Sequence, residues 1–154
     1  MKKRSLIALL LCAVMLLACG CSAEPKTFTT NGLTIELTDD FTEETMDGFT
    51  AAFQSKDVFV FALKESFNVL GSDMNLDEYA QLVLDANTME AEIQHESEQT
   101  FFTFEKSVSG KDMTYTAVVY KGEDAYWMIQ FACLTSDYAK LKDTILGYAA
   151  TVEV

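Results

Sequence analysis

Two cysteines, Cys19 and Cys21, stand two residues apart at the end of an apolar run that begins at Leu6. Such a pair can hold a metal ion, form part of a disulfide or carry a covalent modification. A structural zinc site of this type needs four ligands, mostly cysteine or histidine. The chain has four cysteines, with Cys12 inside the apolar run, and a single histidine. The pair therefore lacks the partners of a zinc site.

The residues before the pair indicate an export signal. The chain starts with a basic segment, Met1–Arg4, and continues with thirteen apolar residues, Leu6–Ala18. Thirteen helical residues span only about 20 Å, whereas the hydrocarbon core of a bilayer is about 30 Å thick. A basic start, a short apolar segment and small residues at its end are typical of a signal peptide. We therefore expect residues 1–18 to be removed rather than to remain as a membrane anchor.

The cysteine that follows this segment matches a known processing site. Leu16-Leu17-Ala18-Cys19 resembles the lipobox of bacterial lipoproteins, in which the cysteine is acylated and becomes the first residue of the mature chain. The alternative, Cys21, is preceded by a poorer match with Ala in place of Leu. We predict that Cys19 carries the lipid, with palmitate among its acyl chains. The lipid would anchor the protein on the outer, extracytoplasmic face of the bacterial membrane. Residues 19–26 would form the tether, and residues 27–154 a single domain.

The composition of the processed chain excludes one class of partner. Residues 19–154 hold 8 lysines, no arginine and 24 acidic residues, an excess of 16 negative charges. Nucleic-acid binding requires a basic surface that displaces counterions, so we expect no nucleic-acid partner. The expected partners are the membrane, through the anchor, and a membrane-proximal protein or a small ligand.

Hydrophobic periodicity predicts an α+β domain with an antiparallel sheet. Asn75 and Glu78 form a capping-box pattern before an apolar helical stripe, and we expect Ser136 to cap a final helix. The segment 89–98 matches neither a helical nor a strand pattern clearly. The predicted strands are a hairpin around Asn31-Gly32, then 49–54, 58–63, 100–108, 113–121 and 125–133.

The last predicted strand is apolar on both faces, which indicates that both are covered. One side carries Trp127, Ile129, Phe131 and Cys133, and the other Tyr126, Met128 and Ala132. One amphipathic helix on each side would make a three-layer α/β/α sandwich.

A resemblance to a known family supports this architecture. The order "NGLTIELTDDF", paired strands, "LDEYAQLVL", a strand meander, "YWMIQFAC" and "SDYAKLKDTILGYAATV" is similar to the PsbP-like family, which includes many small bacterial lipoproteins. The resemblance implies a central antiparallel sheet with helices on both faces. It also implies a non-catalytic accessory or binding protein. No metal or partner motif of the photosynthetic members is present to carry over, so we expect no catalytic residues, no metal site and no cofactor.

Two alternatives remain open for the acidic residues. A pair of carboxylates could make the protein an extracytoplasmic hydrolase, and a loop with five acids between Asp39 and Asp47 could bind a divalent cation weakly. His95-Glu96 begins like the zinc-protease motif H-E-x-x-H, but Gln99 stands in the position of the second histidine. Asp73-Met74-Asn75-Leu76-Asp77 imitates half of a calcium loop, although helix capping explains these residues better.

A binding surface is predicted on the last two strands. If the turn Gly122–Asp124 sets the usual register, Val118, Tyr120, Tyr126 and Met128 share a face. Tyrosine and methionine suit recognition, so we single out Tyr120, Tyr126 and Met128 as candidate binding residues. The alternative is that these side chains are core beneath the helix at 76–86. We expect Cys133 to be a buried free thiol, with pairing to Cys21 as the alternative.

Overall fold

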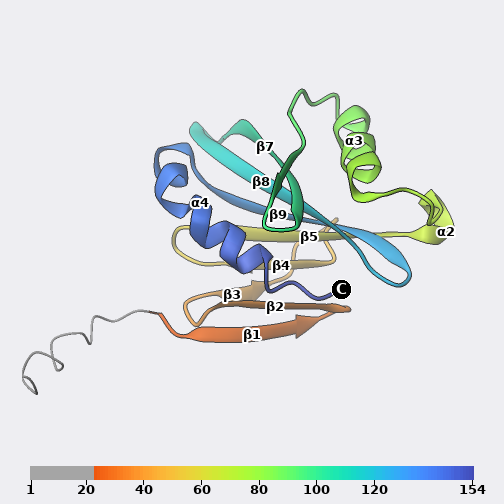
Figure 1. The fold of residues 1–154 in the computed structure, drawn as a ribbon. Coiled ribbons are helices and arrows are strands. Elements are labelled where there is room, and N and C mark those ends of the chain that lie inside the picture. The colour runs from red at the N-terminus through yellow and green to blue at the C-terminus, as the bar shows by residue number, and fades with distance from the viewer. Residues whose placement is uncertain (1–22) are drawn as a thin grey trace, which may run out of the picture.

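The structure is a computed structural model that describes residues 23–154. The predicted signal peptide and both Cys19 and Cys21 lie outside the described residues. The described part contains two antiparallel sheets of two and seven strands (Figure 1).

The smaller sheet is the predicted hairpin of β1 (Pro25–Thr30) and β2 (Leu33–Thr38). Its turn residues Asn31 and Gly32 have φ angles of 51° and 89°, as a type I′ turn requires, so the prediction from Asn-Gly is confirmed. The hairpin does not join the large sheet. It lies beside that sheet as a separate ribbon (Figure 1).

The large sheet has the strand order β3-β4-β5-β9-β8-β7-β6, with antiparallel pairing throughout. The central strand β9 is the last in sequence and pairs with β5, more than sixty residues earlier in the chain. The predicted strands are confirmed within a few residues, and a short strand, β6, occupies part of the undecided segment 89–98. The bounds are β3 (Thr42–Glu44), β4 (Ala51–Gln54), β5 (Phe59–Ser66), β6 (Gln94–Glu96), β7 (Gln99–Val108), β8 (Lys111–Lys121) and β9 (Ala125–Leu134).

The helices are α2 (Phe67–Leu70), α3 (Leu76–Ala86) and α4 (Thr135–Ala149). Asn75 accepts a hydrogen bond from the Glu78 amide, and the Glu78 carboxylate accepts one from the Asn75 amide, which confirms the capping box. The predicted cap at Ser136 is wrong. β9 runs directly into α4, so Ser136 already lies inside the first turn, and Leu134 occupies the cap position without a side-chain hydrogen bond.

The two faces of the sheet bury separate apolar clusters. The first face packs against α4 and the hairpin, and its cluster includes Trp127, Ile129 and Phe131. The second face packs against α3, and its cluster includes Phe102 and Val119. The strand pairings and both clusters are thus built from residues 23–154, so this part of the chain contains a complete core.

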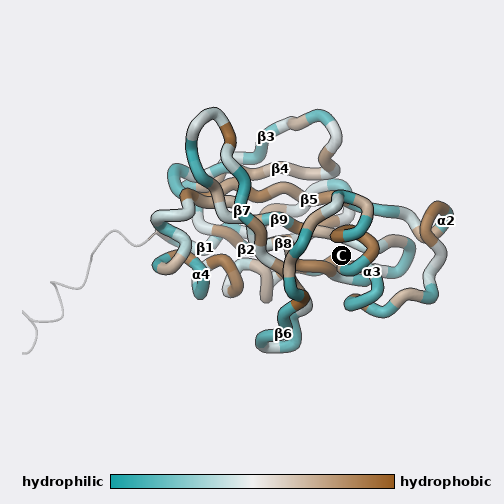
Figure 2. Tube along the Cα trace, turned by 90° about the horizontal axis from the view of Figure 1, so that it is seen from above, coloured by the Kyte–Doolittle hydropathy of each residue, from teal (hydrophilic) through white to brown (hydrophobic). Residues whose placement is uncertain are grey.

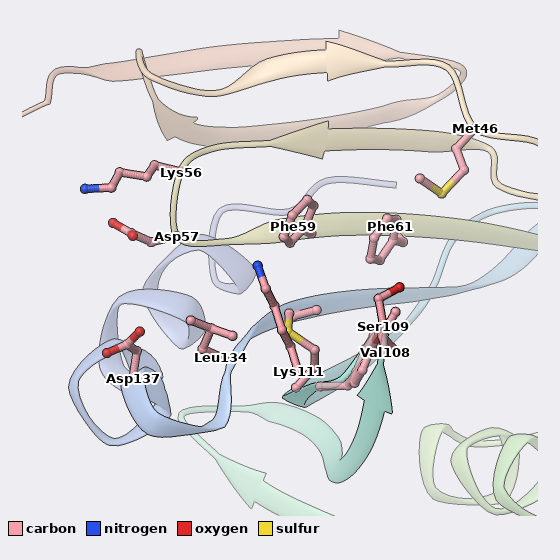
Figure 3. Close-up of a pocket in the computed structure, with 13 residues that line it drawn as sticks. Met46, Lys56, Asp57, Phe59, Phe61, Val108, Ser109, Lys111, Leu134 and Asp137 are labelled. Atoms are coloured by element: carbon pink, nitrogen blue, oxygen red, sulfur yellow. The ribbon is translucent and has the colours of Figure 1, made fainter.

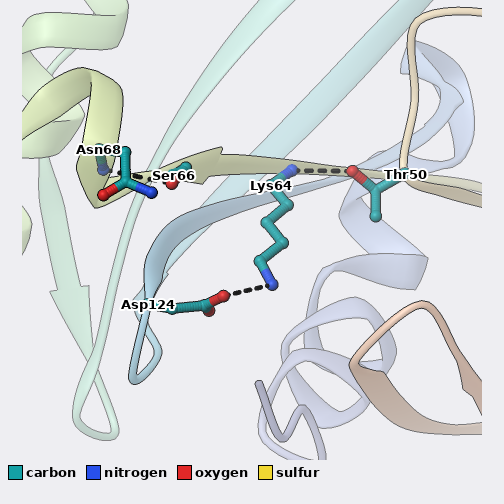
Figure 4. A network of polar contacts seen from close by, with 5 residues as sticks. All are labelled: Thr50, Lys64, Ser66, Asn68 and Asp124. Carbon is teal, nitrogen blue, oxygen red and sulfur yellow. Dashed lines mark hydrogen bonds and ion pairs between the residues drawn. The ribbon is translucent and has the colours of Figure 1, made fainter.

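Polar contacts hold the end of the sheet from which α2 starts (Figure 4). Lys64 on β5 pairs with Asp124 at 3.0 Å, and its amide donates to the Thr50 hydroxyl at 3.0 Å. Ser66 caps α2 by accepting from the Asn68 amide. These contacts fix the position of α2, and they join the turn after β8 to β5. Within residues 23–154, none of the helices has both the length and the apolar character needed to cross a bilayer.

Candidate binding groove

The register between β8 and β9 differs by one residue from the predicted register. The Gly122 amide donates to the Ala125 carbonyl at 2.9 Å and closes a two-residue turn, Glu123-Asp124. Lys121 is therefore opposite Tyr126, and Val119 is opposite Met128. Because side chains alternate along a strand, a shift of one residue moves Val118 and Tyr120 to the other face of the sheet.

The predicted binding surface is consequently wrong. Tyr126 has an exposed fraction of 0% and Met128 one of 7%, and both lie beneath α3. The Tyr126 ring stacks on Tyr79 with centroids 4.7 Å apart, and its hydroxyl donates to the Met74 carbonyl at 2.8 Å. Tyr120 packs against the opposite cluster and donates to the Ala149 carbonyl, and burial raises the pKa of its hydroxyl. Tyr126 and Met128 are therefore core beneath α3, as the alternative interpretation held, whereas Tyr120 is half-buried against the cluster on the other face.

The α3 helix leaves part of its own sheet face uncovered. An 11-residue helix is about 16 Å long, whereas strands of ten or eleven residues extend about 33 Å. Beyond the helix, the small Ala132 on this face is buried, whereas the large side chains are half-buried or exposed. They are Phe59 and Phe61 on β5, Gln130 and Leu134 on β9, Met113 and Tyr115 on β8, and Phe104 and Val108 on β7.

Two adjoining cavities follow this uncovered part of the face. Their volumes are about 430 and 660 Å³, and they share Met46, Phe61, Val108 and Tyr115. The first also contacts Lys56, Lys111 and Asp137, as Figure 3 shows, and the second reaches Val83 and Met89 beside α3. We refer to the two cavities together as the aromatic groove.

Stacked rings form the walls of the aromatic groove. Phe104 and Tyr115 lie parallel, with centroids 4.8 Å apart and an interplanar angle of 5°. Phe59 and Phe61 are also parallel, at 6.3 Å, and Phe49 packs on Phe61 at 5.1 Å. Four of these rings lie on strands of one sheet, and each ring contacts a neighbouring ring, so the groove offers a preformed apolar surface at a low cost in side-chain entropy.

The groove is lined by residues of both positive and negative charge. Lys56, Lys106 and Lys111 are exposed, and none of them belongs to the ion pairs found among residues 23–154. The acids that contact the groove are Asp57, Glu105 and Asp137. Lysines and acids are therefore equal in number here, in contrast to the threefold excess of acids over lysines in residues 19–154.

The other candidates from the sequence lie away from the groove. The Nε2 atom of His95 is 2.8 Å from Asp77 Oδ1, and both side chains are more than half exposed. Asp73 to Asp77 belong to the cap region of α3. The acids between Asp39 and Asp47 are exposed, and across residues 23–154 no group of three histidine, cysteine or acidic side chains is placed to share a metal ion.

Cys133 is a free thiol in the core beneath α4, with an exposed fraction of 0%. Burial raises the pKa of this thiol, and the nearby charge of Asp137 raises it further. The free, buried state is the predicted one. Pairing with Cys21 concerns a residue outside the described part of the chain.

Sequence reasoning did not identify the aromatic groove, although its aromatic alternation was visible. Phe59 and Phe61 alternate with other residues in the predicted strand 58–63, and they share a face in the structure. Nothing in the sequence placed β5 beside β9, however, because their pairing joins distant segments. The groove also depends on which part of the sheet α3 covers, and the position of a helix over a sheet is not given by the helical pattern.

Comparisons with known proteins give matches only at the level of structure: no family model and no curated protein sequence matches the chain. The solved structure of the cyanobacterial PsbP protein CyanoP from Synechocystis superposes with a TM-score of 0.56 at 14% identity. The match covers 89% of this chain and 95% of CyanoP.

Two further structures superpose equally well. The Ran-binding protein Mog1p of Saccharomyces cerevisiae gives a TM-score of 0.56 at 12% identity and covers 86% of this chain and 96% of its own. A protein from Bacteroides thetaiotaomicron gives 0.56 at 14% identity and covers 84% of this chain and 48% of its own. The mostly antiparallel sheet, matched over nearly the whole of CyanoP, shows that the chain has the PsbP-like fold.

Proposed function

We propose that this protein is a lipid-anchored, extracytoplasmic bacterial lipoprotein whose domain is a non-catalytic binding module, and that the aromatic groove is its ligand site. The observation that carries the proposal is the uncovered half of the α3 face, where stacked rings line two adjoining cavities. Exposing such a surface to water is unfavourable unless a ligand or partner covers it during function.

The dimensions of the aromatic groove fit a small ligand. Small-molecule sites in proteins have volumes of about 300–1,000 Å³, with mostly apolar walls and a few polar groups that orient the ligand. The two cavities, of about 430 and 660 Å³, fall in this range. A binding role is also compatible with the fold, since Mog1p is described as a Ran-binding protein.

The chemistry of the groove supports binding rather than hydrolysis. A carboxylic acid that donates a proton in glycoside hydrolysis needs an apolar setting that keeps it protonated. Among residues 23–154, no aspartate or glutamate is buried. In the groove, Asp57 and Glu105 are exposed, Asp137 is half-buried, and lysines share their cavities. No specific observation therefore favours the hydrolase alternative.

The predicted anchor would keep the groove close to the membrane. From Cys19 to the start of β1 at Pro25 the chain has six residues, which reach at most about 20 Å when fully extended. Two or more acyl chains hold a protein stably at a bilayer. This short tether favours a ligand that enters the groove from the membrane or its immediate surroundings.

The test uses the neutral fluorescent compound N-phenyl-1-naphthylamine and the domain of residues 23–154. We expect saturable binding, with Phe61→Ala raising Kd about tenfold because Phe61 contacts both cavities. Val108→Ser should weaken binding severalfold, because Val108, with an exposed fraction of 42%, also contacts both cavities.

Val69→Ser is the matched control, since Val69 has an exposed fraction of 80% and lies on α2, outside the groove. It should leave Kd unchanged. The absence of saturable binding, or equal effects of Val108→Ser and Val69→Ser, would contradict the proposal.

A further inference from the structure

The lysines of the domain differ in whether another group interacts with their ammonium group. Four of the eight interact with other groups: Lys64 and Lys142 form ion pairs, Lys121 donates to the carbonyls of Ser72 and Met74, and Lys26 lies over the Phe28 ring. The other four have no such partner within residues 23–154. Three of these, Lys56, Lys106 and Lys111, contact the aromatic groove, and only Lys140 lies elsewhere, on α4.

Two of these lysines lie at one end of the groove. Lys56 belongs to the turn before β5, and Lys111 begins β8. Figure 3 shows the Lys111 side chain extending toward Phe59, while Lys56 and Asp57 lie to the left of that ring, with the Lys56 side chain directed away from it. Ammonium groups at the end of a mostly apolar cavity can hold an anion.

The acids at the same end limit the charge of that anion. Asp57 and Asp137 contact the same cavity as the two lysines, so this end carries no net charge when empty. A head group with one negative charge can approach the ammonium groups at a small cost in repulsion from the two carboxylates. A phosphate monoester carries nearly two negative charges at pH 7, so its attraction to the lysines and its repulsion from the carboxylates both double. The cost of removing its hydration rises with the square of the charge and therefore increases more than the attraction does.

From the end with two lysines, the groove continues over Phe59, Phe61, Tyr115 and Phe104 toward α3, with Glu105 and Lys106 beside its far part. Two lysines at one end and a long aromatic surface beyond them match a molecule with one head and one tail. Resting on the function proposed above, we infer that the ligand is a single-chain amphiphile with a carboxylate head, which lies at the Lys56–Lys111 end while its chain covers the aromatic rings.

The inference is tested with four twelve-carbon compounds that differ only in the head group. Dodecanoate, dodecyl phosphate, dodecanol and dodecylamine are each used below their micelle-forming concentrations to displace N-phenyl-1-naphthylamine from residues 23–154 at pH 8. Dodecanoate should bind at least tenfold more tightly than dodecanol or dodecylamine, and more tightly than dodecyl phosphate. Because the preference is electrostatic, it should decrease at high salt.

A lysine variant and its matched control locate the head group. Lys111→Met should raise the Kd of dodecanoate about tenfold without changing that of dodecanol, and Lys111 is exposed, so its loss does not disturb the core. Lys140→Met removes the same charge on α4 and should change neither value.

The outcomes separate this inference from the proposed function. Equal affinities for dodecanoate and dodecanol, or no effect of Lys111→Met, would overturn the carboxylate head while leaving an apolar site in place. Tighter binding of dodecyl phosphate would replace the carboxylate with a phosphate head. If none of the four compounds displaces a bound neutral dye, the groove takes no single-chain amphiphile, and if the dye itself does not bind, the proposed function is wrong as well.

Discussion

Two tyrosines on the same face of the sheet lie in different environments. Tyr126 is buried beneath α3 between Tyr79 and Phe67, whereas Tyr115 is half-buried in the aromatic groove, stacked on Phe104. Residue type is the same in both positions. The difference comes from whether the helix covers the strand at that point, and it determines which tyrosine is available to a ligand.

The two tyrosines should respond differently to truncation. Tyr126→Ala removes a buried ring and its hydrogen bond to Met74, and should lower the free energy of unfolding by about 3–5 kcal/mol. Tyr115→Ala should cost only about 1 kcal/mol, mainly from the lost ring stacking. Urea denaturation of both variants measures the difference, and equal losses would mean that Tyr115 is also core.

The buried hydroxyl of Tyr79 predicts a loss of stability at alkaline pH. Burial raises the pKa of Tyr79 above its ordinary value of about 10, and its hydrogen bond to Glu65 (2.6 Å) and the charge of that carboxylate raise it further. The contribution of this group to stability is full below pH 10. It is lost as the pH rises toward the folded-state pKa, since the unfolded chain releases the proton first.

Urea midpoints measured between pH 8 and pH 11.5 should therefore fall. Tyr79→Phe should make this fall less steep, because phenylalanine has no proton to release. A slope identical to that of the parent protein would show that Tyr79 does not contribute to the alkaline transition.

At the scale of elements, the two long helices begin in different ways. α3 has a reciprocal capping box, with Asn75 and Glu78 each accepting from the other's amide. α4 continues directly from β9 and has no side-chain cap. Asn75→Ala should therefore cost about 1 kcal/mol of stability, whereas Ser136→Ala should cost almost nothing. Thermal unfolding of the pair checks this difference, and a comparable loss for Ser136→Ala would contradict the structure of this junction.

Periodicity predicted the elements well because local side-chain spacing determines them. The Asn31-Gly32 hairpin, the α3 capping box and the alternation Trp127, Ile129, Phe131 were all readable in the sequence. The β8–β9 register was not, because Gly122–Asp124 fits turns of two or three residues equally well. That single choice placed Tyr120 and Tyr126 on one face in the prediction and on opposite faces in the structure.

The groove was beyond sequence reasoning for a related reason. Its residues come from β5, β7, β8 and β9 and from the loop at Met46, and only the long-range pairing of β5 with β9 brings them together. The charge pattern of the sequence does not indicate the groove, since Lys56 lies far from Lys106 and Lys111 in the chain.

At the scale of the whole molecule, the anchor and the domain make separate predictions. Cys19→Ser should abolish lipidation and either release the protein into the medium or leave an uncleaved precursor. Cys21→Ser should change little. Mass spectrometry of the membrane-bound form measures both, and acyl groups on Cys21 would show that the lipidation site is assigned to the wrong cysteine.

The opposite faces of the domain should also differ in their contact with ligand. One face is closed by α4 and the β1–β2 hairpin, with hydrophilic residues along the outer strand β6 (Figure 2). The other face is open beyond α3. A ligand that binds the open half must perturb β5, β8 and the end of β7, and must leave the hairpin and α4 beyond its first turn unaffected.

The central claim is that the aromatic groove is the ligand site, and backbone amide chemical shifts test it most directly. Residues 23–154, labelled with ¹⁵N, are titrated with dodecanoate or N-phenyl-1-naphthylamine. We predict that the largest shift changes cluster at Phe61, Val108 and Tyr115, three of the four residues common to both cavities, while those of the hairpin and of α4 beyond its first turn, which contains Asp137, stay constant. Changes concentrated on α4 and the hairpin, or no saturable changes at all, would contradict the account.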